Sequence, residues 1–107
     1  MQILVLVLCT KGRSLRQAIA DDARLESFGL QVTKETQPGR APGWLKLHGT
    51  DRTRGALNIE WDSESSLLRA RVITRGTRKP SPIVGEFVNY LLARFSSRIV
   101  SITTAFR

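Results

Sequence analysis

The sequence has little of the residues that many small domains use for stability or chemistry. Its 107 residues include one cysteine, Cys9, and one histidine, His48. A single cysteine excludes an internal disulfide and a cysteine-rich zinc site. A single histidine with no partners at suitable spacing argues against a histidine-based triad or metal cluster. We therefore expect no metal and no cofactor, and a core that depends on side-chain packing alone.

Long apolar runs are also missing. The most apolar stretch, Ile3–Cys9, is far shorter than the about 18 residues needed to span a bilayer. No lysine or arginine precedes it, and no small-residue cleavage pattern follows it. We therefore expect a buried strand covered on both faces, no membrane contact and a cytoplasmic location.

Acidic residues are few, since 9 of them stand against 17 basic residues, most of which are arginine. The net charge of +8 favours attraction to phosphates, acidic proteins or anionic lipid. Arginine in particular forks onto phosphate and stacks on bases. A hydrophobic content of 41% and a charged content of 24% are those of an ordinary globular protein. The length predicts a single domain over residues 1–107.

The residue pattern predicts an α+β fold in the order β-α-β-β-β-β-α-β. Apolar or alternating segments predict strands over residues 2–8, 30–36, 44–49, 56–61, 67–75 and 99–106. Helices are expected from Ser14 to about Ser27 and from Ser81 to about Ser96. In the first helix Arg16 and Asp22 are expected to face water, and in the second Gly85 is expected to permit close packing on the sheet. Together they predict a mainly antiparallel mixed sheet with two helices packed on one face. The first and last strands are the most apolar, so we expect them in the middle of the sheet.

Alternation along the middle strands predicts a sheet face, opposite the helices, that is rich in arginine. The strands contribute Trp44, Lys46, Arg69, Arg71 and Arg75, and the loops add Arg52, Arg54, Arg78 and Lys79. Such a face is typical of proteins that bind single-stranded nucleic acid, with charge for the backbone and a flat ring, here Trp44, for the bases. The leading hypothesis is a small, non-enzymatic protein that contacts RNA, DNA or another polyanion.

Two other interpretations of this face remain open. An antiparallel sheet commonly shows one polar face to water. The same face could instead bind a protein partner or form a homodimer. The sequence contains no RNP-type pattern, zinc finger or GXXG clamp that would favour nucleic acid specifically.

A second candidate site lies at the turn between the first strand and the first helix. Its string Cys9-Thr10-Lys11-Gly12-Arg13-Ser14 resembles the Cys-x-x-Gly-x-Ser loop of phosphotransferase-system IIB proteins, in which the cysteine is phosphorylated. The strand–loop–helix order is also similar to that of low-molecular-weight tyrosine phosphatases, but Leu15 stands where their signature needs arginine. The resemblance ends before residues 44–75, which alternate as strands with no helix between them.

This turn could bind an anion or react with phosphate. A helix N-terminus with Lys11 and Arg13 nearby would lower the pKa of the Cys9 thiol. In that case Gly12 and Ser14 would complete the anion site. Cys9 could equally be the last core residue of its strand.

Overall fold

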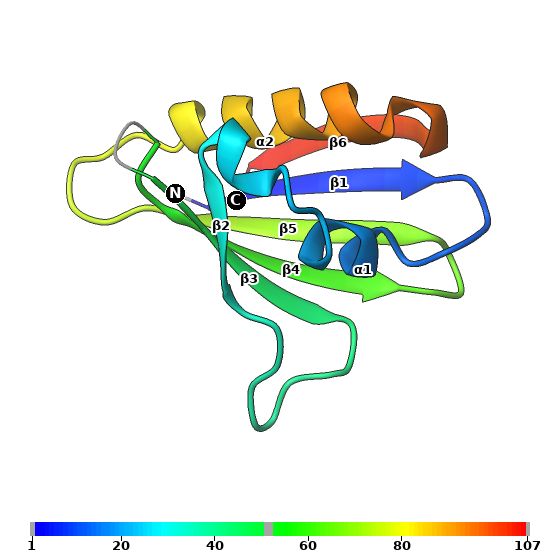
Figure 1. The fold of residues 1–107 in the computed structure, drawn as a ribbon. Helices are drawn as coiled ribbons and strands as arrows, with labels where there is room; N and C mark the ends of the chain where they lie inside the picture. The colour runs from blue at the N-terminus through cyan, green and yellow to red at the C-terminus, as the bar shows by residue number, and fades with distance from the viewer. Residues whose placement is uncertain (1, 51–52, 107) are drawn as a thin grey trace.

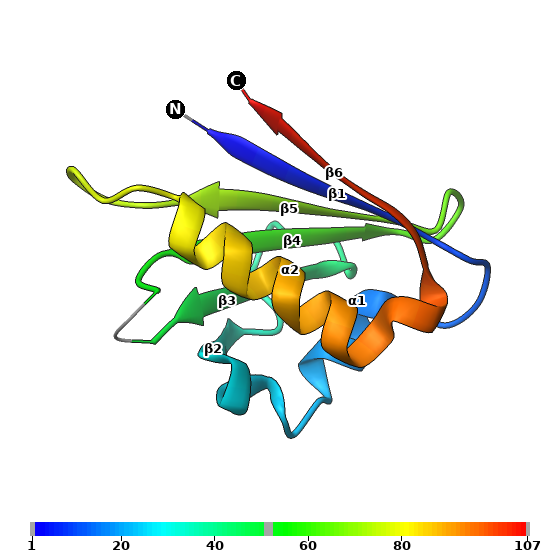
Figure 2. The same cartoon turned by 90° about the horizontal axis from the view of Figure 1, so that it is seen from above.

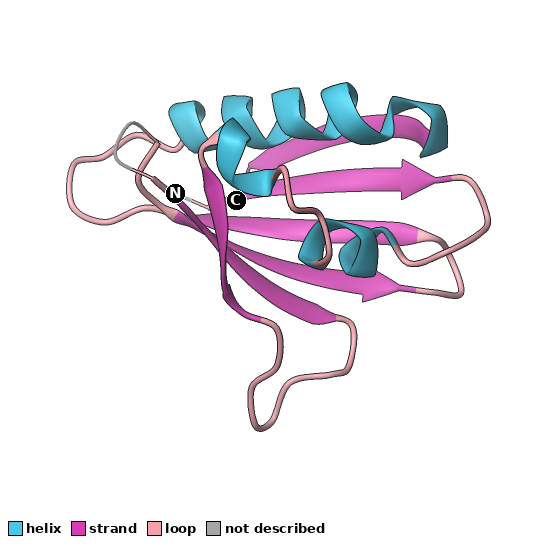
Figure 3. Ribbon diagram, viewed as in Figure 1, coloured by secondary structure: helices cyan, strands magenta, loops and turns pink. Residues whose placement is uncertain are grey.

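The computed structural model describes residues 2–50 and 53–106, and within them six strands form one sheet with the helices on one side (Figures 1 and 2). Figure 3 separates the helical layer from the sheet. The chain therefore has the predicted α+β class. The elements are β1 (Ile3–Cys9), α1 (Leu15–Ala20), a 3-10 turn η1 (Leu25–Phe28), β2 (Leu30–Lys34), β3 (Trp44–Gly49), β4 (Ala56–Asp62), β5 (Leu67–Ile73), α2 (Ser81–Phe95), a 3-10 turn η2 (Ser96–Arg98) and β6 (Ile99–Phe106).

The strands lie in the order β2-β3-β4-β5-β1-β6, and all pairings between neighbours are antiparallel among the described residues. β2 to β5 form a meander, after which β1 pairs with β5 and β6 pairs with the other side of β1. The expectation of a central place is confirmed for β1 and wrong for β6. β6 follows α2, and the remaining edge of β1 is the position that it takes.

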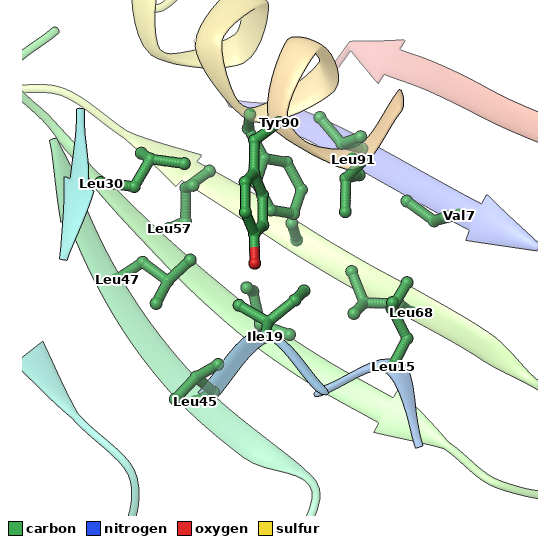
Figure 4. Packing of buried hydrophobic residues seen from close by; sticks show 14 of the residues in the cluster. Val7, Leu15, Ile19, Leu30, Leu45, Leu47, Leu57, Leu68, Tyr90 and Leu91 are labelled. Carbon is green, nitrogen blue, oxygen red and sulfur yellow. The ribbon is translucent and has the colours of Figure 1, made fainter. Parts of the chain in front are cut away.

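The helix-facing side of the sheet carries the residues that the alternation predicted. Leu45, Ile59 and Ala70 lie opposite one another on β3, β4 and β5, and Leu47, Leu57 and Val72 form the next row. These side chains are buried in one cluster with residues of both helices. Figure 4 shows Tyr90 and Leu91 of α2 above the sheet, with Leu15 and Ile19 of α1 beside them. This cluster fixes the helices to one face and leaves the other face open.

The helix predicted from Ser14 to Ser27 is wrong in its second half. The hydroxyl of Ser14 caps α1 as expected, because its Oγ accepts the Gln17 N–H at 3.1 Å. The helix then ends near Asp22, whose carboxylate accepts hydrogen bonds from its own turn and from α2. Aspartate competes with helical hydrogen bonding in this way. The chain continues as η1, and Gly29 ends that turn with a left-handed φ of 77°.

α2 matches its predicted range to within one residue at each end. Its N-cap position is Pro80, with Ser81 already in the helix. Gly85 is exposed, and apart from its chain neighbours and the nearby backbone of its own helix no described atom lies within 4 Å of the position that a Cβ would take. The expectation that Gly85 permits close packing on the sheet is therefore wrong.

Asp22, Tyr90 and Arg94 form a polar cluster where α2 meets the segment after α1. The Tyr90 hydroxyl donates to Asp22 Oδ2 at 2.8 Å, and Arg94 donates from Nε and Nη2 to the two carboxylate oxygens at 3.1 Å. Burial raises the pKa of Asp22, but hydrogen bonds from Arg94, the Arg24 N–H and Tyr90 outweigh it and lower the pKa overall. The sequence predicted that Asp22 would face water, and this is wrong because two α2 side chains cover it.

Arg16 was also expected to face water, and it is 6% exposed instead. Its Nε and Nη2 donate to the Trp44 carbonyl at 3.0 and 2.9 Å, and Nη2 also donates to the Glu35 carbonyl. Nη1 donates to Gln17 Oε1 at 2.7 Å. Arg16 therefore ties α1 to both ends of the loop between β2 and β3.

Candidate polyanion site

The open face of the sheet carries rows of side chains that the strand register sets opposite one another. Lys46 lies opposite Asn58, and Asn58 lies opposite Arg71. The next rows are His48, Ala56 and Ile73 at one end, and Trp44, Glu60 and Arg69 at the other. Strand alternation alone puts these residues on one face. The position of each basic residue along its strand then determines which basic side chains lie close together.

A concavity of about 470 Å³ lies at the His48 end of this face. It is lined by Thr33, Gly55, Ala56, Ile73 and five basic residues, namely Lys46, His48, Arg54, Arg75 and Arg78. No acidic side chain is among the described residues that line it. We call it the cationic concavity. Concave sites lined by one sign of charge concentrate the field and attract oppositely charged ligands.

A tight turn after β5 brings Arg75 and Arg78 to the same concavity. The Arg78 N–H donates to the Arg75 carbonyl at 3.2 Å, and the Thr74 hydroxyl donates to the Arg78 carbonyl at 3.0 Å. Gly76 adopts a φ of 63° within this turn, a conformation that glycine takes without steric cost. The local sequence therefore folds the loop back, so that both arginines line one site.

The β3–β4 connection brings Arg54 to the same place. The Gly49 N–H donates to the Gly55 carbonyl at 2.9 Å and closes the hairpin. A Cβ at Gly49 would stand 1.8 Å from the Thr53 carbonyl oxygen. This turn therefore requires glycine at position 49.

His48 forms part of the wall of the concavity, a role that the sequence analysis did not assign to it. Its Nε2 lies 3.1 Å from Gln31 Oε1, and its Nδ1 lies 2.7 Å from the Thr33 hydroxyl. A hydroxyl can donate to a neutral ring nitrogen or accept from a protonated one. The ring is therefore held in place by β2 in either protonation state. In the sequence, only the position of His48 two residues after Lys46 on an alternating strand indicated that it shares a face with basic residues.

The other end of the open face has acidic side chains, because Glu60, Asp62 and Glu64 lie there around Arg69. Arg69 lies directly opposite Glu60, and such opposite-charge pairs across strands are stabilising. Hydrogen bonds from Ser65 and the Glu64 N–H lower the pKa of Asp62, and Arg69 acts in the same direction. Arg69 is therefore separated from the cationic concavity and faces carboxylates.

The structure divides the predicted binding residues into groups. Lys46, Arg54, Arg75 and Arg78 come together in the concavity. Arg71 lies in a neighbouring hollow, which is lined by Gln2, Leu4, Asn58, Glu60, Arg69 and Arg71. Lys79 is exposed in the following loop and does not line the concavity. Arg52 lies outside the described residues.

Trp44 lies on the expected strand but is 2% exposed, so the expectation that it offers a ring for base stacking is wrong. The preceding loop folds back over it, with the Trp44 N–H donating to the Ala41 carbonyl at 3.0 Å. The Arg40 guanidinium carbon lies 5.5 Å from the ring centroid. The indole Nε1 is buried with no hydrogen-bond partner among the described residues. The prolines and glycines of residues 37–43 predict a loop, but they do not predict that the loop folds over the Trp44 ring.

β1 gives the open face an apolar half. Ile3, Val5 and Val7 are buried toward the helices, whereas Leu4 and Leu6 are half-buried on the open face. Leu8 on β1 is 39% exposed. The expectation that β1 is covered on both faces is therefore wrong. This aliphatic strip begins at Leu4, opposite Arg71, and ends at Leu8, opposite Leu67, at the end of the face away from the cationic concavity.

The turn from Cys9 to Ser14 lacks the properties of a reactive thiol site. Cys9 is buried, and this burial raises the pKa of its thiol even though Arg98 acts to lower it. The prediction that Lys11 and Arg13 lower this pKa is therefore wrong. Arg98 donates to the Arg13 carbonyl, and the Thr10 N–H donates to the Arg98 carbonyl at 2.9 Å. The Arg13 carbonyl of this turn thus accepts a hydrogen bond from the cationic side chain of Arg98, and the Ser14 hydroxyl caps α1.

Within the described stretches, no group of three or more histidine, cysteine, aspartate or glutamate side chains is arranged to hold a metal ion. None of the helices in the same stretches combines the length and apolarity needed to cross a membrane. Comparisons with models of protein families, with curated proteins and with solved structures give no match.

Proposed function

We propose that this protein binds single-stranded nucleic acid, taking backbone phosphates in the cationic concavity. The observation that carries the proposal is the convergence of five basic residues from β3 and two loops on one hollow, which has no acidic side chain among its described lining residues. Arginine and lysine on a concave surface are the groups that hold phosphates. The excess of 17 basic over 9 acidic residues adds attraction at longer range.

The apolar part of the open face supports a ligand that has both phosphates and planar bases. Ala56 and Ile73 line the concavity, and Leu4 lies in the adjoining hollow beside Arg71. Bases or sugars can contact this aliphatic surface while phosphates meet the guanidinium groups. Because Trp44 is buried, the about 1–3 kcal/mol that aromatic stacking adds for each base is missing. Binding is therefore expected to depend mainly on salt and only weakly on sequence.

Titration of labelled single-stranded RNA and DNA with the protein at low salt tests this proposal. Affinity should fall as salt rises, with a log–log slope of about −0.7 for each phosphate contacted. The double variant Arg75→Ala/Arg78→Ala should weaken binding at least about tenfold, since each phosphate contact contributes a charge-assisted hydrogen bond. Absence of binding to either strand at low salt would contradict the proposal.

Lys11→Ala/Arg13→Ala is the matched control because it removes the same two charges from an exposed turn outside the concavity. Net charge alone would weaken binding equally in both double variants. A local site would leave the control close to the wild-type affinity.

A protein partner on the open face is the second candidate function, favoured by the aliphatic row of Leu4, Leu6 and Leu8. Leu6→Lys separates the two. A lysine at this position would disrupt a protein interface, including a face-to-face homodimer, but it would preserve or strengthen nucleic-acid binding. Light scattering and the oligonucleotide titration on the same variant give the two measurements.

A further inference from the structure

The two edges of the sheet differ in how they are protected from further strand pairing. β2 is five residues long, ends at the exposed Lys34, and shifts register against β3 between Val32 and Lys34. η1 packs against it. β6 has eight residues with no charged side chain and no proline from Ile99 to Phe106. Natural edge strands normally carry such protection, because an unprotected edge pairs with another strand.

We propose that β6 pairs antiparallel with β6 of a second copy of this chain, around a two-fold axis that runs through the sheet. The pairing would join the two sheets into one continuous sheet and satisfy the backbone N–H and C=O groups on the outer side of β6. This surface is distinct from the cationic concavity, so the inference goes beyond the proposed function. It also leaves both open faces on the same side of the combined sheet.

The composition of β6 suits pairing with itself. Its residues are mostly β-branched, namely Ile99, Val100, Ile102, Thr103 and Thr104. Isologous pairing brings each strand against an identical one, and like charges directly opposite would oppose it. β6 itself contains no charged residue, so pairing with a second β6 sets no like charges opposite each other within the strand.

An apolar groove beside β6 gives the second copy more than a strand to contact. The groove has a volume of about 450 Å³, and α2 contributes Val88 and Leu92 to it. Ile99, Val100 and Ile102 line the β6 side. Leu92 is 52% exposed, Val100 is 60% exposed, and Phe106 at the end of β6 is 69% exposed. A partner paired on β6 would cover these side chains.

The size of the edge is compatible with a modest dimer. Eight strand residues extend about 26 Å, and one sheet layer plus one helix layer is roughly 20 Å high. The flat area of this edge is therefore on the order of 500 Å², without the additional area of protruding side chains. A standard interface buries about 800 Å² on each partner. We therefore expect a dimer that dissociates on dilution. The protected β2 edge stops growth at two copies.

Repulsion between two chains of charge +8 comes at this edge from Arg98, which directly precedes β6, and from Arg69 and Arg71 of β5, two strands or about 10 Å away in the plane of the sheet. The cations of β3 are four strands away, at about 19 Å. Charges are screened over about 8 Å at physiological ionic strength. Salt should consequently strengthen the dimer slightly while it weakens polyanion binding.

Sedimentation equilibrium from about 1 µM to about 1 mM, a range that covers weak and moderate affinities, tests the proposal. The wild type should shift from monomer to dimer with rising concentration and form nothing larger. Thr104→Lys places two lysines near the two-fold axis on the helix side of the sheet and should weaken the dimer at least about tenfold. Ser63→Lys adds the same charge in the exposed β4–β5 turn and should leave it unchanged.

Hydrogen exchange identifies the surface involved. The amides of β6 that face away from β1 should be protected at high concentration and exchange rapidly on dilution. A monomer across the whole range overturns the proposal, even if a strand from another protein later proves to pair with β6. A dimer that survives Thr104→Lys but is lost in Leu6→Lys also overturns it and assigns the interface to the open face. Oligonucleotide affinity of monomeric Thr104→Lys, whose added charge lies on the helix side of the sheet, shows separately whether the proposed function holds.

Discussion

The arginines of the helices and the arginines of the cationic concavity have different roles, although the side chain is the same. Arg16 and Arg94 are held by named acceptors, the carbonyls of Trp44 and Glu35 and the carboxylate of Asp22. Arg75 and Arg78 stand in a loop whose hydrogen bonds use backbone groups and the Thr74 hydroxyl, and their side chains line a hollow. The first pair stabilises the fold and the second pair faces solvent and ligand. Substitutions should therefore separate stability from binding.

Arg16→Ala should have the largest effect, lowering the free energy of unfolding by roughly 3 kcal/mol. It removes charge-assisted hydrogen bonds worth about 1.5–3 kcal/mol each and leaves two carbonyls without their donor. Urea denaturation measures the loss. Arg13→Ala is the control, because that side chain is exposed, and it should change stability by less than about 0.5 kcal/mol. Equal stability of the two variants would show that Arg16 does not anchor the loop.

Asp22→Asn should be next, with a loss of about 2 kcal/mol, since Tyr90 and Arg94 lose a charged acceptor. Tyr90→Phe removes only one of these hydrogen bonds and should cost about 1 kcal/mol. Thermal unfolding of both variants measures the order. A larger loss for Tyr90→Phe would mean that ring packing, and not the carboxylate, stabilises the cluster.

The same cluster gives the protein an acid dependence. The pKa of Asp22 is lower in the folded state than in the unfolded chain. Its stabilisation is therefore complete above about pH 4, where free aspartate titrates, and is lost as pH falls through the folded pKa. Below pH 4 the wild type should lose more stability than Asp22→Asn does. Parallel pH profiles of the two proteins would contradict this assignment.

Arg75→Lys/Arg78→Lys tests whether the cationic concavity binds through guanidinium geometry or through charge alone. The charge is kept, but the planar fork that binds phosphate bidentately is lost. We expect affinity for single-stranded nucleic acid to fall about fivefold, about 1 kcal/mol, with an unchanged salt slope. Unfolding should be unaffected. An unchanged affinity would show that the site reads charge alone.

Gly85→Ala should have the smallest effect, a gain of about 0.5–1 kcal/mol in stability. Apart from its chain neighbours and the nearby backbone of its own helix, the added methyl group meets no described atom within 4 Å, and it removes the flexibility of glycine within α2. The change strengthens the helix that presents Arg94 without touching either arginine group. Differential scanning calorimetry measures it, and a loss of stability would reveal a contact that the helix makes elsewhere.

Periodicity was sufficient to predict most of the fold. The strand patterns of residues 44–75 gave the sheet faces correctly, because each side chain packs close to its neighbours on adjacent strands. The sequence could not show that Asp22 ends α1, since its partners Tyr90 and Arg94 lie far along the chain. Nor could it place β6, because its apolar residues fit a central strand and an unprotected edge equally well.

The candidate site was predicted less completely than the fold. Alternation identified Lys46, and the neighbouring loops supplied Arg54 and Arg78, but alternation gave Arg69 the same weight as Arg75. The register places Arg69 against Glu60, and only a known strand pairing reveals that. Burial of Trp44 depends on the closure of a loop held by Arg16, an interaction between residues far apart in sequence.

The pairing of Ile3 with Phe106 has a consequence for how the chain folds. The two ends of the described chain lie side by side (Figures 1 and 2), and β1 cannot acquire its second neighbour until the last strand is in place. Contacts between segments so distant in sequence slow folding, toward the range of milliseconds to seconds. A circular permutant that joins residue 106 to residue 3 through a short linker would turn this slow closure into a local hairpin. Its sheet would then nucleate at the strand that the natural order adds last.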